Sequence, residues 1–293
     1  MSSSLLRPLG PALLLLAVTA LAGCQSIEVK DGDMFRRSGA TPPADWLARA
    51  QPLAAPRQVE RLQFGSEDGV TLGGLFLRHP RAVATVLYFQ GAGNHVQKDA
   101  SWLATLAGEL PVHLMVWDYR GTGLSAGEGG TARLLADARA AAAEARRQGG
   151  ADLPLVYWGY SLGTLVGAHL AQDLAPDALI LEGALTNAQY WADNKVPWYG
   201  RPFVSVHLAD TVRAYDNRQA LQRLRRPTLM LVGGQDPVTP PRFARAIVER
   251  MQHPQCATLV EAPRAGHGGI HRHVESRAAL QRFLDELKDK AGC

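Results

Sequence analysis

A nucleophilic serine on a tight turn is indicated by the sequence Gly159-Tyr160-Ser161-Leu162-Gly163. An apolar, β-prone run (155–158) precedes these residues, and a mostly apolar run (164–171) follows them and predicts a helix. Between a strand and a helix, glycines on both sides of a serine leave room for a turn that raises its hydroxyl above the sheet edge. We therefore predict that Ser161 is the nucleophile. The backbone N–H of Leu162, at the helix start, is expected to face the developing oxyanion.

A second match to the same pattern lies at Gly123-Leu124-Ser125-Ala126-Gly127. Residues 118–122 separate this match from the preceding predicted strand, and Glu128-Gly129-Gly130 follows it where a helix would have to begin. Because the letters are the same, only the structural context distinguishes the two serines. That context predicts that Ser125 is a loop residue.

A serine needs a general base, and that base needs an acid that orients it. Asp236 follows the apolar run 227–232 and a glycine pair, and His267 lies in a Gly-rich loop after the last predicted strand. The carboxyl ends of parallel strands meet at one sheet edge, which brings both residues toward Ser161. We predict the catalytic set Ser161, His267 and Asp236. A turn or helix N-cap aspartate is the alternative interpretation of Asp236.

Two further histidines, His271 and His273, follow the predicted base. Their spacing could suggest a metal site, but they lack a partner carboxylate motif. We interpret them as solvated residues at the start of the last helix. No metal is predicted, and acyl transfer by a serine requires no cofactor.

The elements that position these residues follow a regular pattern from Val59 onward. A hairpin of two strands comes first, and strands and helices then alternate, which predicts an α/β fold with a mostly parallel central sheet and helices on both faces. The expected strands are 59–64, 70–77, 83–89, 112–117, 153–158, 178–181, 227–232 and 257–260, and the expected helices are 100–108, 131–148, 161–174, 242–251 and 273–289.

Residues 59–289 resemble an α/β-hydrolase-fold serine hydrolase, from the branch that contains serine aminopeptidase-like and monoacylglycerol-lipase-like enzymes. The chain order Ser, Asp, His is that of α/β hydrolases. The four motifs that carry the resemblance are specific for the fold and say little about the substrate. The resemblance rests on 159–163, on Asp118-Tyr119-Arg120-Gly121-Thr122-Gly123-Leu124-Ser125, on Gly234-Gln235-Asp236-Pro237-Val238 and on Gly266-His267-Gly268.

One position departs from the pattern of that family. After the third expected strand the family has a His-Gly pair and then a residue whose backbone N–H completes the oxyanion hole, whereas this chain has Gln90-Gly91-Ala92. The resemblance implies that the N–H of Ala92 is the second oxyanion donor. The Gln90 side chain is then expected to support the loop in a different way from histidine.

A small cap insertion is expected at residues 184–226, between two strands of the sheet. Its aromatic residues would provide apolar pocket walls or would anchor an irregular segment to the core; both interpretations stay open. The segment is too short for a large lid, so a fairly open pocket is expected. The aromatic residues are Trp191, Trp198, Tyr199, Phe203 and Tyr215.

The beginning of the chain predicts an exported lipoprotein. Arg7 provides a positive charge, the run 9–22 is apolar, and Leu21-Ala22-Gly23-Cys24 resembles the lipobox of bacterial lipoproteins. We predict a signal peptide at 1–23, acylation of Cys24, a lipidated tether with a strap over 24–56 and an α/β-hydrolase domain over 57–293. Gln25 is not the aspartate that resembles an inner-membrane retention signal. The predicted location is therefore the outer membrane, facing the periplasm.

The charge and the cysteine content indicate whether a nucleic-acid partner and a disulfide are expected. The net charge is +4 with no long basic block, so no nucleic-acid partner is expected. Beyond Cys24 only Cys256 and Cys293 remain, and we expect them to be unpaired, although a periplasmic location permits a disulfide.

These features predict a membrane-anchored serine hydrolase that cleaves a small-molecule or lipid-like ester or thioester through an acyl-enzyme. Amide or peptide cleavage by the same triad is one alternative, and a catalytically silent envelope binding or scaffold protein is another. The sequence leaves the physiological substrate and the oligomeric state open.

Overall fold

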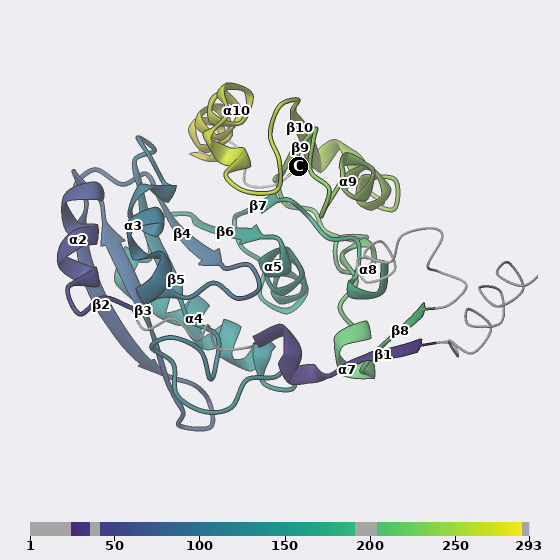
Figure 1. Cartoon of the computed structure of the whole chain (residues 1–293). Helices are drawn as coiled ribbons and strands as arrows, with labels where there is room; N and C mark the ends of the chain where they lie inside the picture. The colour runs from purple at the N-terminus through teal and green to yellow at the C-terminus, as the bar shows by residue number, and fades with distance from the viewer. Residues whose placement is uncertain (1–24, 36–41, 191–203, 289–292) are drawn as a thin grey trace, which may run out of the picture.

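The computed structural model describes residues 25–35, 42–190, 204–288 and 293 (Figure 1). A central eight-stranded sheet has the strands β2 (Gln58–Gly65), β3 (Thr71–Arg78), β4 (Ala84–Phe89), β5 (Val112–Trp117), β6 (Leu155–Tyr160), β7 (Ala178–Glu182), β9 (Thr228–Gly233) and β10 (Ala257–Ala262). Their order is β10-β9-β7-β6-β4-β5-β3-β2. Neighbours are parallel from β10 to β5 and antiparallel from β5 to β2, which confirms the predicted mostly parallel sheet.

Helices cover both faces of this sheet. One face carries α2 (Trp46–Leu53), α3 (Val96–Leu106) and α10 (Val274–Asp285), and the other carries α4 (Leu134–Gly149), α5 (Leu162–Asp173) and α9 (Pro241–Val248). Side chains alternate between these two layers along each strand. In β5, Leu114 and Val116 pack with the α3 layer, and Met115 and Trp117 pack with the α5 layer. Burial on both faces explains why the strands read as continuous apolar runs.

Helix α3 begins at Val96, four residues before the predicted start at 100. His95 caps it: the imidazole Nδ1 accepts a hydrogen bond from the Lys98 N–H at 3.4 Å, and the Asp99 carboxylate accepts one from the His95 N–H at 3.0 Å. Because histidine is not among the preferred N-cap residues, the sequence pattern does not reveal this start.

The cap segment leaves the sheet after β7 and returns at β9. Its described part contains β8 (Val204–Leu208), α7 (Asp210–Arg213) and α8 (Asn217–Ala220). Tyr215 is buried, and its ring lies 4.7 Å from that of His169. The other predicted cap aromatics, Trp191, Trp198, Tyr199 and Phe203, lie outside the described residues.

A second, two-stranded sheet joins the N-terminal segment to the cap. β1 (Gln25–Val29) pairs in parallel with β8, with Gln25 opposite Val204 and Val29 opposite Leu208. Figure 1 shows the two strands side by side near α7, away from the central sheet. The sequence pattern does not indicate this pairing, because each strand is only five residues long and they are far apart in the chain.

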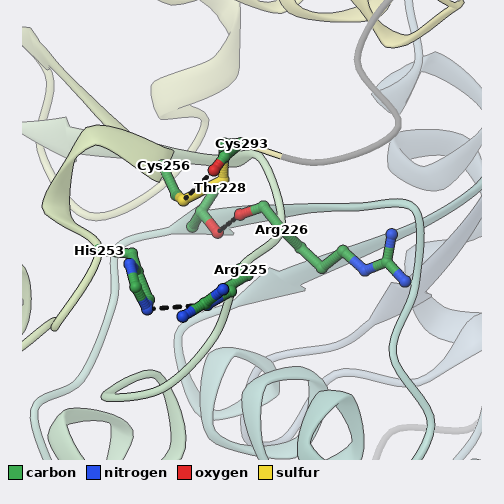
Figure 2. Close-up of a disulfide and its surroundings, with 6 residues drawn as sticks. All are labelled: Arg225, Arg226, Thr228, His253, Cys256 and Cys293. Carbon is green, nitrogen blue, oxygen red and sulfur yellow. Dashed lines mark hydrogen bonds between the residues drawn. A yellow bond between two sulfur atoms is a disulfide. The ribbon is translucent and has the colours of Figure 1, made fainter.

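A disulfide links Cys256 to Cys293, contrary to the expectation of two unpaired thiols (Figure 2). Cys256 ends the 3-10 helix η2 (Pro254–Cys256), directly before β10. The two Cα atoms lie 5.3 Å apart, within the range that a disulfide spans. Helix α10, near the end of the chain, packs against β10, and the pairing depends on such tertiary contacts, which the cysteine spacing does not show.

The predicted signal peptide (1–23) and the predicted acylation site, Cys24, lie outside the described residues and stay predictions. Among the residues that the structure describes, no helix is both long enough and apolar enough to cross a membrane.

Candidate active site

Ser161 sits at the junction of β6 and α5 with φ +51° and ψ −114°. It is the only residue other than glycine with positive φ in the described part of the chain, and such a backbone is strained and concentrated at functional sites. A Cβ on Gly159 would lie 2.5 Å from the Gly163 carbonyl oxygen, and one on Gly163 would collide with the Phe89 carbonyl. Both glycines are therefore required for the predicted turn.

The structure brings the predicted base and acid to this serine. His267 Nε2 lies 3.0 Å from Ser161 Oγ, and His267 Nδ1 lies 2.8 Å from Asp236 Oδ2. Asp236 follows β9 and His267 follows β10, as the sheet-edge argument requires. These are the contacts of a nucleophile, a general base and an orienting acid. The catalytic roles themselves remain predictions.

The Asp236 carboxylate is surrounded by hydrogen-bond donors. The N–H groups of Val238 and Thr239 donate to Oδ1 at 2.7 and 2.9 Å, and the Thr239 hydroxyl donates to Oδ2 at 2.6 Å. Burial alone would raise the pKa of Asp236, but the hydrogen bonds from His267 and Thr239 outweigh it and lower the pKa below its ordinary value. The carboxylate thus holds the turn, as the alternative interpretation of Asp236 expected, and also contacts the imidazole.

Thr239 is a site residue that the sequence analysis missed. Its hydroxyl contacts Asp236 and also lies 3.1 Å from His267 Nδ1. The signal that could have revealed it is its position three residues after Asp236, where a turn brings a hydroxyl back to the carboxylate.

The two predicted oxyanion donors come from two different segments of the chain. Leu162 is the first residue of α5, and Ala92 lies in the loop after β4. Both line a pocket of about 350 Å³ together with Ser161 and His267. Backbone N–H groups at these two positions fit the predicted role, which stays a prediction.

Gln90 supports the Ala92 loop from inside the protein. Its side-chain Nε2 donates to the Trp117 carbonyl at 2.9 Å and to Asp118 Oδ1 at 3.1 Å, and the backbone carbonyl of Gln90 accepts from the Tyr119 hydroxyl at 2.9 Å. Glutamine in the place of the family's histidine therefore links the loop to the last residue of β5 and to the two residues that follow it.

The second serine, Ser125, forms hydrogen bonds that hold its loop in place. Ser125 is buried; its hydroxyl donates to the Asp118 carbonyl at 2.5 Å and accepts from the Gly73 N–H at 2.9 Å. The Asp118 carboxylate accepts from the N–H groups of Val96 and Leu124, both at 2.7 Å. Burial raises the pKa of Asp118 to about 6, although these hydrogen bonds oppose the shift. The structure agrees with the interpretation of Ser125 as a loop residue.

His271 is buried, contrary to the expectation of a solvated residue. It lies in η3 (Ile270–Arg272), and its Nδ1 lies 2.9 Å from Glu182 Oε1, which also accepts the His271 backbone N–H at 3.1 Å. Trp158 Nε1 donates to Oε2 of the same carboxylate at 3.2 Å. Because η3 turns back onto the end of β7, a partner that is distant in sequence buries the imidazole. His273, half-buried, is the N-cap of α10.

The pocket in front of Ser161 is mostly apolar. No Asp, Glu, Lys or Arg occurs among its described lining residues. Nor do the described residues contain a group of three or more His, Cys, Asp or Glu side chains that could hold a metal ion. The aliphatic lining side chains are Val29, Ala92, Leu162, Leu185, Ala188, Leu208, Val212 and Val238.

Two family models match the chain. The model described as "Serine aminopeptidase, S33" matches residues 80–208, and the model described as "TAP-like protein" matches residues 188–291. Together they span residues 80–291, which include the strands from β4 to β10, the cap and the loops that carry the site.

Two relatives are similar to this chain over most of its length. An uncharacterized protein of Mycobacterium tuberculosis is 28% identical, covering 75% of this chain and 77% of its own length. The α/β hydrolase domain-containing protein 17B of Homo sapiens is 25% identical, covering 83% and 80%.

Among solved structures, an esterase of Pyrococcus furiosus matches with a TM-score of 0.62 at 14% identity, covering 88% of this chain and 99% of its own. A Xanthomonas campestris protein described as an α/β serine hydrolase without lid matches with a TM-score of 0.56 at 20% identity, covering 78% and 94%. The chain therefore has the α/β-hydrolase fold, and the matches support a hydrolase.

Proposed function

We propose that this protein is a membrane-anchored serine hydrolase that cleaves carboxylic esters or thioesters through an acyl-enzyme. The observation that carries the proposal is the continuous chain of contacts from Ser161 Oγ through His267 to Asp236, with the serine on a strained turn. A scaffold protein without activity would not need to maintain such strain at a single serine.

The chemistry follows from these contacts. As Ser161 Oγ bonds to the substrate carbonyl carbon, its proton moves to His267 Nε2, which lies 3.0 Å away. Asp236 accepts the Nδ1–H and so holds the tautomer that leaves Nε2 free to act as a base. The N–H groups of Leu162 and Ala92 stabilise the oxyanion. When the bond to the leaving group breaks, the imidazolium protonates that group, and water then releases the acyl group by the same steps.

The lining of the pocket favours esters and thioesters over aminoacyl amides. One matching family model is named for aminopeptidases, whose substrates carry an α-ammonium group. A buried ammonium needs a carboxylate or several acceptors as partners. The described lining offers apolar side chains and no carboxylate, which suits an uncharged acyl group.

Turnover of matched substrates tests this choice. The purified protein should hydrolyse p-nitrophenyl acyl esters and acyl thioesters with a far higher kcat/KM than aminoacyl p-nitroanilides, and Ser161→Ala should remove both ester and thioester activity. A preference for the aminoacyl amides would contradict the ester assignment and favour the peptidase alternative.

The anchor is the acylated Cys24, which Leu21-Ala22-Gly23 precedes. β1 begins at Gln25, and its last residue, Val29, lines the pocket five positions after the anchor. Extended strand spans about 3.3 Å per residue, so the pocket would lie within roughly 17 Å of the acylated residue. An amphiphilic ester in the same membrane would then be close to Ser161.

The Cys24→Ser variant tests the anchor. We expect the wild-type protein to fractionate with membranes and to carry acyl mass on Cys24. The variant should lose the acyl mass and leave the membrane fraction or accumulate as the uncleaved precursor. Wild-type protein that is free in the periplasmic extract, with no acyl mass on Cys24, would contradict the lipoprotein assignment.

A further inference from the structure

The N-terminal segment forms part of the pocket wall, although it is distant in sequence from the catalytic loops. Val29, the last residue of β1, lines the pocket that contains Ser161 and His267. It packs against a small apolar cluster of the cap that contains Ala188, Leu208 and Val212, and these three residues line the same pocket. The Val29 carbonyl also accepts a hydrogen bond from the Ala209 N–H at 3.1 Å, which continues the β1–β8 pairing toward α7.

Contacts directly after β1 hold the strand in place. Asp31, in η1 (Asp31–Phe35), accepts hydrogen bonds from the Thr131 N–H at 2.9 Å and from the Thr211 hydroxyl at 3.1 Å. Thr211 belongs to α7 in the cap and Thr131 to the body, so one carboxylate joins the N-terminal segment to both. Phe35 is 5% exposed, and its ring packs edge-on against Tyr119 at 5.6 Å.

The chemistry of this wall differs from that of the catalytic end of the pocket. The polar lining residues Ser161, His267 and Asn94 come from the loops that follow β6, β10 and β4, whereas β1, β8 and α7 contribute only aliphatic side chains to the described lining. Burial of methylene groups against such a surface is favourable, and a charged or strongly polar leaving group gains nothing from it. The wall therefore suits the acyl chain of the substrate.

We propose that β1 is the outer wall of an acyl-chain subsite, and that Val29 determines how long an aliphatic acyl chain the enzyme accepts. This inference rests on the proposed esterase function and adds to it the substrate class, an ester of an unbranched aliphatic acid. Val29 contacts the chain rather than the reacting atoms, so it is a specificity-determining residue.

A series of p-nitrophenyl esters, from acetate through butyrate, hexanoate and octanoate to dodecanoate, tests the proposal on the full-length protein. In Val29→Trp, the ratio of kcat/KM for each longer ester to kcat/KM for acetate should fall, by roughly fourfold for each methylene group that the indole displaces. Val29→Ala should shift the preference in the other direction, toward longer chains.

Ser26→Trp is the matched control, because Ser26 is an exposed residue on the opposite face of the same strand. The control should keep the wild-type profile. Labelling of Val29→Trp by a small fluorophosphonate at the wild-type rate would show that the triad is intact. If Val29→Trp labels normally and keeps the wild-type chain-length profile, the acyl-wall proposal is wrong. If wild-type protein hydrolyses no ester of the series, the proposed esterase function fails instead.

Discussion

The chain contains the pattern Gly-x-Ser-x-Gly twice, and the two copies have opposite environments. At 159–163 the serine has positive φ and its hydroxyl lies 3.0 Å from an imidazole nitrogen in an open pocket. At 123–127 the serine is 5% exposed, and its hydroxyl joins two backbone segments, through the Asp118 carbonyl and the Gly73 N–H.

The difference lies in what the glycines accommodate. Gly159 and Gly163 allow a strand and a helix to meet so closely that the serine is raised above the sheet. Gly123 has φ +47°, and a Cβ there would collide with the Asp118 carboxylate, so this loop is wrapped around a buried acid. In the first copy the strained backbone places Ser161 in the pocket lining. In the second copy the Ser125 hydroxyl holds a loop in place through hydrogen bonds to backbone groups.

Removal of the Ser161 hydroxyl should have the largest effect. Ser161→Ala should lower kcat for ester hydrolysis by at least roughly 10⁴-fold, because the acyl-enzyme cannot form. His267→Ala should have a similar effect, and the double variant should be little worse, because the residues act as a unit. Steady-state kinetics with p-nitrophenyl butyrate measures all three. Losses that multiply in the double variant would mean that Ser161 and His267 do not act together.

Asp236→Asn should lower kcat by roughly 10⁴-fold with the fold retained, because an amide favours the wrong tautomer of His267. A circular dichroism spectrum and a melting curve like those of the wild type would show that the loss is chemical. Near-normal turnover by Asp236→Asn would exclude Asp236 as the orienting acid.

The two buried acids should give opposite pH dependence of stability. Asp118 keeps its proton in the folded protein up to a pKa of about 6, whereas the unfolded chain releases it near its ordinary value. Stability from this group is therefore greatest below the unfolded pKa, about 3.9, and is lost as the pH rises through about 6, by roughly 3 kcal/mol. For Asp236 the folded pKa is lowered, so its contribution is present above the unfolded pKa and is lost as the pH falls.

Urea unfolding of wild type and Asp118→Asn between about pH 4 and 7 measures the first of these contributions. The stability of wild type relative to the variant should decrease as the pH rises. A relative stability that stays level or increases with pH would show that Asp118 is not the buried, proton-retaining acid.

Ser125→Ala should affect stability and leave catalysis unchanged. The variant loses a donor to the Asp118 carbonyl and leaves the Gly73 N–H without its acceptor, at a cost of about 1–3 kcal/mol. We expect a lower melting temperature and a kcat/KM within about twofold of wild type, because the lost hydrogen bonds join two backbone segments and not the residues of the triad. Loss of activity with an unchanged melting temperature would place Ser125 in the chemistry.

Thr239→Val should have a smaller effect on rate than the loss of Ser161, His267 or Asp236. It removes the hydroxyl that donates to Asp236 Oδ2 at 2.6 Å while keeping a similar shape. A hydrogen bond to a charged group contributes about 1.5–3 kcal/mol, so kcat should fall by roughly tenfold or more. Thr239→Ser, which keeps the hydroxyl, should restore most of the loss. Equal rates for Thr239→Ser and Thr239→Val would mean that the hydroxyl does not act through Asp236.

The sequence predicts the parts of this molecule that depend on local pattern. Apolar runs identify the sheet, and strand-end positions identify Ser161, Asp236 and His267, because parallel strands bring their carboxyl ends together. The pairing of β1 with β8, the burial of His271 by Glu182 and the disulfide at Cys256 each depend on a partner far along the chain. Such contacts leave no local pattern, so the position of Val29 in the pocket lining becomes visible only in the structure.

The site at which a fluorophosphonate attaches is the most direct test of whether Ser161, and not Ser125, is the nucleophile. After labelling, digestion and peptide mass spectrometry, the adduct should be on the peptide that contains Ser161 in wild type and in Ser125→Ala, and it should be absent in Ser161→Ala. An adduct on Ser125, or labelling that survives Ser161→Ala, would contradict the assignment of Ser161 as the nucleophile.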